Sequence, residues 1–327
     1  MKNLEFLKKS LDQLNKLTDE TYSSESSQIA KELWYAHLQK DNPLWKHLEA
    51  KPFIYKNKRS SAHIIAFLDS RLPGIGLVGY FACTDASAGA DVLKQATEWL
   101  HKNHGVKDIY GPINGTATSD YRLNLREDFQ FPGEPVNPSC QIDAFEKAGF
   151  TEFNRYVSAE TKYYRILKKI LFAAPKVSNN FRVRPFDTQN QTRDLKHFHG
   201  LMTTIFPKQS VYCPKLSWEE RAYGFKHKDP FFNPSYMWFL EYNNNPIGLI
   251  NAYPHEDRLV VKTIGILPKY RGKKLSHLLI RKVHDQASKD GLKTATYAMV
   301  RVGNSAYKMK KPGIKINRHY MTMKKSF

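Results

Sequence analysis

The segment from Lys262 to Arg281, KTIGILPKYRGKKLSHLLIR, combines residue types that together could bind an anion. An apolar run ends at Pro268, a basic turn with one glycine follows, and leucines then recur at helical spacing. This pattern predicts a strand, a loop and a helix that begins near Ser276. A loop that opens a helix presents free backbone N–H groups and the positive end of the helix dipole. The segment therefore predicts an anion site at the start of this helix.

The net charge of +20 lies almost entirely in the C-terminal half of the chain. From residue 176 onward there are 28 lysines and arginines against 10 aspartates and glutamates, a net +18, whereas residues 1–175 carry only +2. Such asymmetry favours a polyanionic ligand, which could be a phosphorylated cofactor, a nucleic acid or an acidic substrate. The plain alternative is a solvated basic surface that aids solubility.

The length of 327 residues predicts two domains, and a hydrophobic content of 41% suffices for two cores. No apolar run is long enough for a membrane helix, and residues 1–20 form a charged amphipathic pattern, so we expect a cytoplasmic protein without a membrane partner. The cysteines at 83, 140 and 213 are odd in number and far apart in sequence. We expect reduced thiols, no disulfide and no metal site.

Hydrophobic periodicity divides the chain into a helical segment over residues 1–50 and two units over residues 51–175 and 176–327. Strands and helices alternate in each unit in a mixed order, which predicts an α/β fold with a partly parallel sheet. The two units also end alike, with FEKAGFTEFNRYVS at 145–158 and KMKKPGIKINRHYMT at 308–322. We interpret this similarity as a duplication in which only the second copy has a basic loop.

The second unit resembles the acyl-CoA-binding domain of the GCN5-related N-acetyltransferase (GNAT) superfamily. The resemblance rests on the strand and loop residues Ile264, Gly265, Ile266, Leu267, Pro268, Tyr270, Arg271, Gly272 and Ser276, with support from FRVRPFD and Asn304. More loosely, the first unit is similar to the N-terminal lobe of two-lobed bacterial members, through Gly111–Thr116, Tyr121–Arg122 and Glu134–Pro135. The resemblance implies tandem GNAT lobes, each a mixed, partly splayed sheet flanked by helices, with a degenerate N-terminal lobe.

Acetyl-CoA, or another acyl-CoA, is the co-substrate that this resemblance implies. Its pyrophosphate needs backbone N–H donors at a helix start, and its pantetheine arm can pair with the edge of a splayed strand. The cofactor-binding residues would be Ile264, Gly265, Ile266, Arg271, Gly272, Lys273, Lys274, Leu275, Ser276 and Asn304. Two of these depart from the family pattern, because Lys274 and Ser276 stand where the family has small residues, usually glycine or alanine.

The catalytic groups implied by the resemblance are less complete. The position of the usual acid, a tyrosine, holds Lys311, so Tyr307 one turn earlier would substitute, or no acid would be needed. Glu241 would be a general base, with a solvated strand-end carboxylate as the alternative. In the first unit, Arg122 and Glu134 would bind substrate, because they lie in a long polar loop with several glycines and prolines.

Three classes of function are open at this point. The first is N-acetyl or N-acyl transfer to a small-molecule or peptide amine, with CoA held by the C-terminal lobe alone. The second is a transferase that uses an aminoacyl-tRNA, although a nucleic-acid partner is not favoured. The third is a ligand-binding module without catalysis. The sequence does not name the acceptor or the oligomeric state.

Overall fold

The computed structural model describes residues 2–21, 31, 38–117, 121–162, 175–206, 211–226, 232–304 and 313–327. The chain forms two compact units. Unit 1 comprises Met1–Tyr156, Ser210–Pro214 and Arg318–Phe327, and unit 2 comprises Val157–Gln209 and Lys215–Asn317. Among the described residues, no helix combines the length and the apolar character that a membrane span requires.

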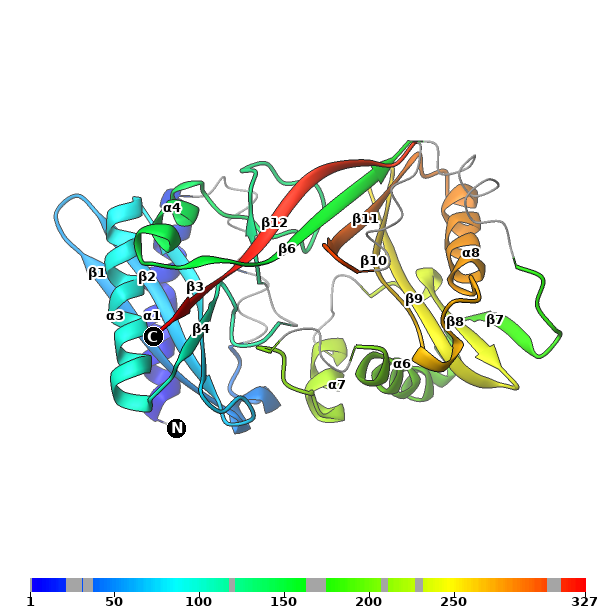
Figure 1. The fold of residues 1–327 in the computed structure, drawn as a ribbon, viewed down its shortest axis with the longest axis horizontal. Helices are drawn as coiled ribbons and strands as arrows, with labels where there is room; N and C mark the ends of the chain where they lie inside the picture. Colours follow the sequence, from blue (N-terminus) through cyan, green and yellow to red (C-terminus); the bar gives the residue numbers. More distant parts are fainter. Residues whose placement is uncertain are drawn as a thin grey trace. The chain divides into compact units, whose positions relative to one another are not determined.

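Unit 1 is a twisted sheet with helices on both faces (Figure 1). Its elements are α1 (Lys2–Thr21), η1 (Pro43–Lys46), β1 (Leu48–Lys56), β2 (Ser61–Asp69), β3 (Ile75–Cys83), α3 (Ala86–His104), β4 (Asp108–Gly111), β5 (Leu123–Asn124) and α4 (Cys140–Lys147), with parts of β6 (Thr151–Thr161) and β12 (Lys315–Ser326). The strand order is β1-β2-β3-β4-β12-β6. β3 and β4 are parallel, whereas β1–β2, β2–β3 and β4–β12 are antiparallel.

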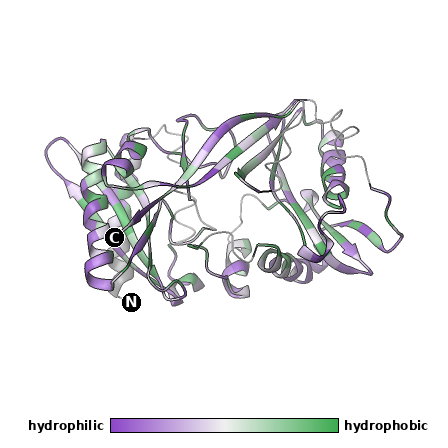
Figure 2. Cartoon of the chain, viewed as in Figure 1, coloured by the Kyte–Doolittle hydropathy of each residue, from purple (hydrophilic) through white to green (hydrophobic). Residues whose placement is uncertain are grey.

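Alternation along β2 explains why both faces of this sheet are covered. Ile64 and Ala66 pack in one cluster with α3 and α4, whereas Ile65 and Phe67 pack in another with the leucines of α1. β2 is therefore buried at nearly every position, and the hydropathy colours in Figure 2 show apolar residues along the inner strands of this unit.

A buried hydrogen-bonded histidine anchors α1 to the sheet. The Ser10 hydroxyl on α1 hydrogen-bonds to Nε2 of His63 on β2, and His63 Nδ1 donates to the Tyr80 carbonyl oxygen at 2.9 Å. His63 is fully buried, and this burial lowers its pKa from 6.5 to about 4 despite the bond to Tyr80. The neutral imidazole is thus the form that fits the folded state.

We expect unit 1 to lose about 2 kcal/mol of unfolding free energy between pH 7.5 and pH 5 through His63 alone. The unfolded state binds this proton below pH 6.5 and the folded state only near pH 4, so stability falls as the pH decreases across this window. Urea unfolding of wild type and His63→Gln at both pH values measures the effect. The variant should lack this part of the pH dependence. An equal change in the free energy of unfolding between the two pH values in both proteins would contradict the prediction.

The strands of unit 2 are also mixed in direction, with α8 on one face and α6 on the other (Figure 1). Its elements are β7 (Phe181–Pro185), η2 (Thr188–Asn190), α6 (Gln191–Ile205), α7 (Trp218–Lys226), η3 (Pro234–Tyr236), β8 (Met237–Tyr242), β9 (Asn245–His255), β10 (Arg258–Ile266), η4 (Pro268–Tyr270), α8 (Ser276–Lys289) and β11 (Thr294–Arg301). The strand order is β6-β11-β10-β9-β8-β7. The antiparallel meander β8-β9-β10 and the parallel pair β10–β11 agree with the predicted α/β class.

The two strands that end the similar segments cross the unit boundaries. β6 contributes its last residues, from Val157, to unit 2, and β12 contributes its last residues, from Arg318, to unit 1. There Met323–Ser326 pair with β4. These compact units have other bounds than the predicted ranges 51–175 and 176–327, and the predicted domain ranges stay a prediction.

Candidate functional site

β10 leaves its parallel neighbour halfway along its length. Its register with β9 extends from Arg258 to Ile266, whereas it pairs with β11 only through Arg258–Val261. Lys262 is the extra residue of an irregularity in the β9 register, at the point where the β11 pairing ends. Within the described chain, the pairing with β11 does not extend to the part of β10 from Thr263 to Ile266. This geometry confirms the predicted splayed sheet.

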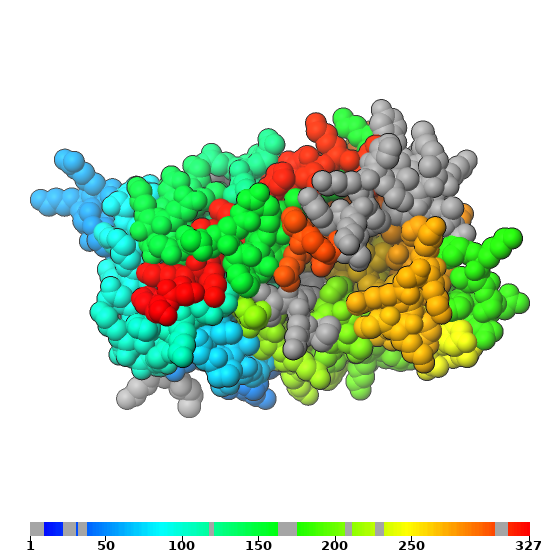
Figure 3. Space-filling view, in the orientation of Figure 1, coloured from blue at the N-terminus to red at the C-terminus, as the bar shows by residue number. Residues whose placement is uncertain are grey.

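The loop after β10 has a backbone shape suited to an anion. Gly272 has φ +83°, and Lys274 has φ +56° and is followed by right-handed Leu275. Among the described residues, the backbone N–H groups from Gly272 to Ser276 make no hydrogen bond, and no side chain caps α8. Successive N–H groups in such a conformation form a concave nest that attracts anions. Gly272, Lys273 and Lys274 are exposed, and this part of the chain lies at the surface in gold and orange in Figure 3.

The positive φ of Lys274 explains why a small residue suits this position. A side chain with a Cβ costs about 1 kcal/mol in the left-handed region, where glycine is unstrained. Lys274 is exposed, so its side chain is open to solvent. The departure from the family pattern therefore changes the charge of the loop and adds strain, while the turn itself is formed.

Arg271 fastens the loop through two carbonyl oxygens. Its Nε donates to the Ile266 carbonyl at 3.0 Å, and its Nη2 donates to the Ile205 carbonyl at the end of α6 at 3.1 Å. These contacts tie the end of β10 and the end of α6 together, so the side chain supports the loop. Cofactor binding by Arg271 stays a prediction.

The remaining predicted cofactor residues divide between surface and core. Ile264 and Gly265 are half-buried, whereas Ile266 and Leu275 belong to the core under α8. Ser276 is the first residue of α8, and Asn304 lies exposed in a bend after β11. Tyr307, the predicted acid, and Lys311 lie outside the described residues.

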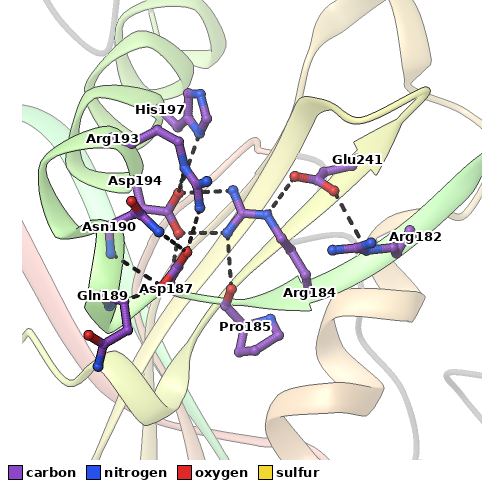
Figure 4. Close-up of polar contacts among 10 residues, drawn as sticks. All are labelled: Arg182, Arg184, Pro185, Asp187, Gln189, Asn190, Arg193, Asp194, His197 and Glu241. Carbon is purple, nitrogen blue, oxygen red and sulfur yellow. Dashed lines mark hydrogen bonds and ion pairs between the residues drawn. The ribbon is translucent and has the colours of Figure 1, made fainter.

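Glu241, the predicted base, belongs to a buried ion-pair network that joins β7, α6 and β8 (Figure 4). Arg184 Nε lies 2.5 Å from Glu241 Oε1, and its Nη1 and Nη2 lie 2.6 and 3.0 Å from the two oxygens of Asp194. Arg182 lies 3.8 Å from the other Glu241 oxygen. Glu241 is only 5% exposed, so the alternative of a solvated carboxylate is wrong. These contacts favour a structural role, and catalysis by Glu241 stays a prediction.

Asp194 is the most deeply buried acid of this network. Burial by itself would raise its pKa, but Arg184, the N–H of Asp187 and Arg193 hold the pKa below its ordinary value. The Asp187 N–H donates to Asp194 Oδ2 at 2.8 Å, which also fixes the turn between β7 and α6. Asp194 is therefore charged in the folded state, and its contacts hold α6 against β7.

In unit 1, other groups of the protein occupy the corresponding strand edge and the corresponding helix start. Along β3, the Val78 carbonyl accepts from the Ile113 N–H at 2.7 Å, and the Asn114 side chain accepts from the Tyr80 N–H at 2.6 Å. A Cβ on Gly79 would lie 2.2 Å from the Ile113 oxygen, so this approach requires glycine. The chain thus occupies the edge that is unpaired in β10.

The helix that follows β3 is capped by its own carboxylate. Asp85 accepts from the N–H groups of Ser87 and Ala88, both at 2.9 Å, at the start of α3. A carboxylate in this place satisfies the N–H groups that a phosphate would need. The Asp-Ala-Ser sequence was a signal for this cap that sequence reasoning missed, whereas nothing local indicated the contacts of Asn114.

The two predicted substrate residues of unit 1 are held differently. Glu134 is buried and accepts from Tyr320 at 2.5 Å, from the Gln130 N–H at 2.8 Å and from Arg318. Burial raises its pKa although these partners oppose the shift. Arg122 has φ +110°, and its guanidinium lies over the rings of Tyr121 and Tyr156, at 3.6 and 4.2 Å. Substrate binding by either residue stays a prediction.

Comparison with known proteins identifies the architecture. Residues 201–308 match the model of the acetyltransferase (GNAT) family. A tandem GNAT protein from the clavulanic acid biosynthesis pathway has a similar structure, with TM-score 0.56, 9% identity, and 90% of this chain and 87% of that chain covered.

Two further solved structures have the same fold. For a GCN5-related N-acetyltransferase from Sphaerobacter thermophilus, the TM-score is 0.50 and the identity 10%, over 82% of this chain and 80% of that chain. For a probable N-acyltransferase from Enterococcus faecalis V583 these values are 0.50 and 10%, over 93% and 71%. No curated protein matches the sequence. Residues 201–308 thus match the acetyltransferase (GNAT) family, and the fold of the chain is similar to that of a tandem GNAT protein.

Proposed function

We propose that the chain is an acyl-CoA-dependent N-acetyltransferase that binds CoA on unit 2 and acylates an amine. The proposal rests on three structural features: the splayed edge of β10, the nest of unpaired N–H groups, and the uncapped start of α8. The three features are consecutive in the chain and suit the arm and the pyrophosphate of one ligand. The GNAT family match covers all three.

The residues present fit CoA as follows. The N–H groups from Gly272 to Ser276 would hold the pyrophosphate, with Lys273 and Lys274 supplying positive charge beside it. The edge from Thr263 to Ile266 would pair with the amides of the pantetheine arm. When bound, acetyl-CoA supplies an acyl group activated as a thioester. Cytoplasmic location and an acceptor that is a small molecule or peptide belong to the same proposal.

For the transfer step, the contribution of this chain is mainly positioning. A fixed thioester beside an amine converts a bimolecular reaction into one with a high effective concentration, which needs few acid–base groups. Tyr307 remains our proposed acid for the leaving thiolate, and Asn304, in the bend after β11, precedes it in the sequence. Glu241 is not needed for this scheme, because its carboxylate is occupied by arginines.

Calorimetry with acetyl-CoA tests the proposal. We expect the native chain to bind one equivalent, and Lys273→Ala to bind about 3- to 10-fold more weakly because a charge beside the nest is lost. Lys269→Ala is the matched control, since Lys269 is also exposed but precedes the nest. Release of free CoA thiol in the presence of an amine panel tests turnover.

Two results would contradict the proposal. If the folded chain does not bind acetyl-CoA, acetyl-CoA is not its co-substrate. Equal affinity of all three proteins would place the ligand away from the nest. Binding without thiol release would support the alternative of a non-catalytic module, and tight, steeply salt-dependent binding of tRNA in place of CoA would support the aminoacyl-tRNA alternative.

A further inference from the structure

Two cysteines that are distant in sequence lie side by side in unit 1. Cys83 ends β3 and Cys140 begins α4, and their Sγ atoms are 3.8 Å apart across 57 positions of sequence. The Cys140 Sγ also lies 3.7 Å from the Cys83 carbonyl oxygen. Sequence reasoning expected separate, reduced thiols, because cysteine spacing gives no information on tertiary proximity.

The contact is held by the surrounding fold and does not depend on the thiols alone. The side chain of Gln141, on the first turn of α4, donates to the Phe81 carbonyl at 3.1 Å. Phe145 on α4 packs edge-on against Phe81, with ring centroids 5.3 Å apart. α4 is therefore fixed against the end of β3 while both cysteines are free thiols.

The two thiols differ in exposure and in acidity. Cys83 is fully buried, and its hydrogen bond to Cys140 together with its burial raises its pKa. Cys140 is half-buried, and the hydrogen bond from Cys83 lowers its pKa, against burial and the opposing charges of Asp85, Asp143 and Glu127. A thiolate is the attacking species in disulfide exchange, so Cys140 is the residue that would meet a reagent first.

We propose that Cys83 and Cys140 are a redox-active dithiol that a low-molecular-weight disulfide of the glutathione class oxidises to an intramolecular disulfide. The Cys140 thiolate attacks one sulfur of the reagent, forms a mixed disulfide and releases one thiolate. Cys83 then loses its proton and attacks the Cys140 sulfur, which expels the second thiolate. Two cysteines are oxidised, and one reagent disulfide is reduced to two thiols.

The geometry requires only a small movement for the second step. A disulfide joins sulfurs about 2.05 Å apart, so the two Sγ atoms must approach by about 1.8 Å. The linked form closes a long loop between β3 and α4, which restricts the unfolded chain. We expect the oxidised protein to melt about 5 °C or more above the reduced protein.

The test is titration of the full chain with oxidised glutathione, followed by denaturation, alkylation and peptide mass spectrometry. We expect one peptide that links Cys83 to Cys140, and an alkylated Cys213. Cys213→Ser is the control and should give the same linkage. Cys83→Ser should retain glutathione on Cys140, whereas in Cys140→Ser the buried Cys83 should take none.

Alkylation of both Cys83 and Cys140 after complete oxidation of the glutathione pool would overturn the proposal, as would a linkage of either residue to Cys213. Glutathione on Cys83 in Cys140→Ser would overturn the order of attack. Circular dichroism verifies that each serine variant is folded, and if one is not, the linkage in wild type and Cys213→Ser decides alone.

Discussion

Replacing Asp194 with alanine is expected to lower the free energy of unfolding of unit 2 by about 3–5 kcal/mol. The change leaves the Arg184 guanidinium, whose side chain is 11% exposed, with Glu241 as its remaining buried partner. It also removes the acceptor of the Asp187 N–H, and thereby one hydrogen bond that fixes the turn between β7 and α6. Urea unfolding followed by circular dichroism measures the loss.

Asp187→Ala is the matched control for this prediction. Asp187 is another aspartate of the same turn, with a side chain 32% exposed, and it caps η2 through Gln189 and Asn190. Its loss should cost about 1 kcal/mol. Similar small losses in both variants would show that the buried network adds little to stability.

The effect of Asp194 should also depend on pH in a defined direction. The folded pKa of Asp194 lies below its ordinary value, so the unfolded state binds the proton more readily. The stabilisation is present above about pH 4 and is lost as the pH falls through the folded pKa. The difference between wild type and Asp194→Ala should therefore narrow in acid, and a constant difference would point to lost packing.

Local signals predicted the strand, loop and helix around the candidate site because each depends on neighbouring residues. Pro268 ends β10, Gly272 permits a positive φ, and the leucines after Ser276 form the buried face of α8. The partners of these elements depend on distant residues. One of the two carbonyls that Arg271 binds belongs to Ile205, 66 positions away, and no local pattern encodes this contact.

The difference between the two units is likewise partly local and partly due to distant residues. The basic loop of the second copy is visible in the sequence, whereas the groups that occupy the corresponding positions of the first copy are visible only in the structure. Asn114 and Ile113 occupy the edge of β3, and Asp85 occupies the start of α3. Glu241 illustrates the converse, since its position at a strand end suggested exposure, whereas an arginine 57 positions away encloses it.

Lys274 offers the sharpest test of the candidate anion site, because residue types with different charge tolerate its left-handed backbone. Glycine, asparagine and aspartate all adopt positive φ more readily than lysine does. Lys274→Gly, Lys274→Asn and Lys274→Asp should therefore all fold, with the glycine variant more stable by about 1 kcal/mol. Any difference in CoA binding among them then reports charge.

We expect Lys274→Gly and Lys274→Asn to change the affinity for acetyl-CoA by about 1 kcal/mol or less, because the backbone N–H groups from Gly272 to Ser276 are retained. Lys274→Asp should weaken binding by about 100-fold or more, since a carboxylate beside these groups both repels the phosphates and competes for the donors, as Asp85 does on α3. Calorimetry of the four proteins at one ionic strength measures the series.

If glycine instead creates or greatly strengthens binding, Lys274 blocks the nest in the native protein, and the chain is then better described as a module that has lost its cofactor. If aspartate binds as tightly as lysine, the pyrophosphate is held elsewhere, because a negative charge cannot enter an anion nest without cost.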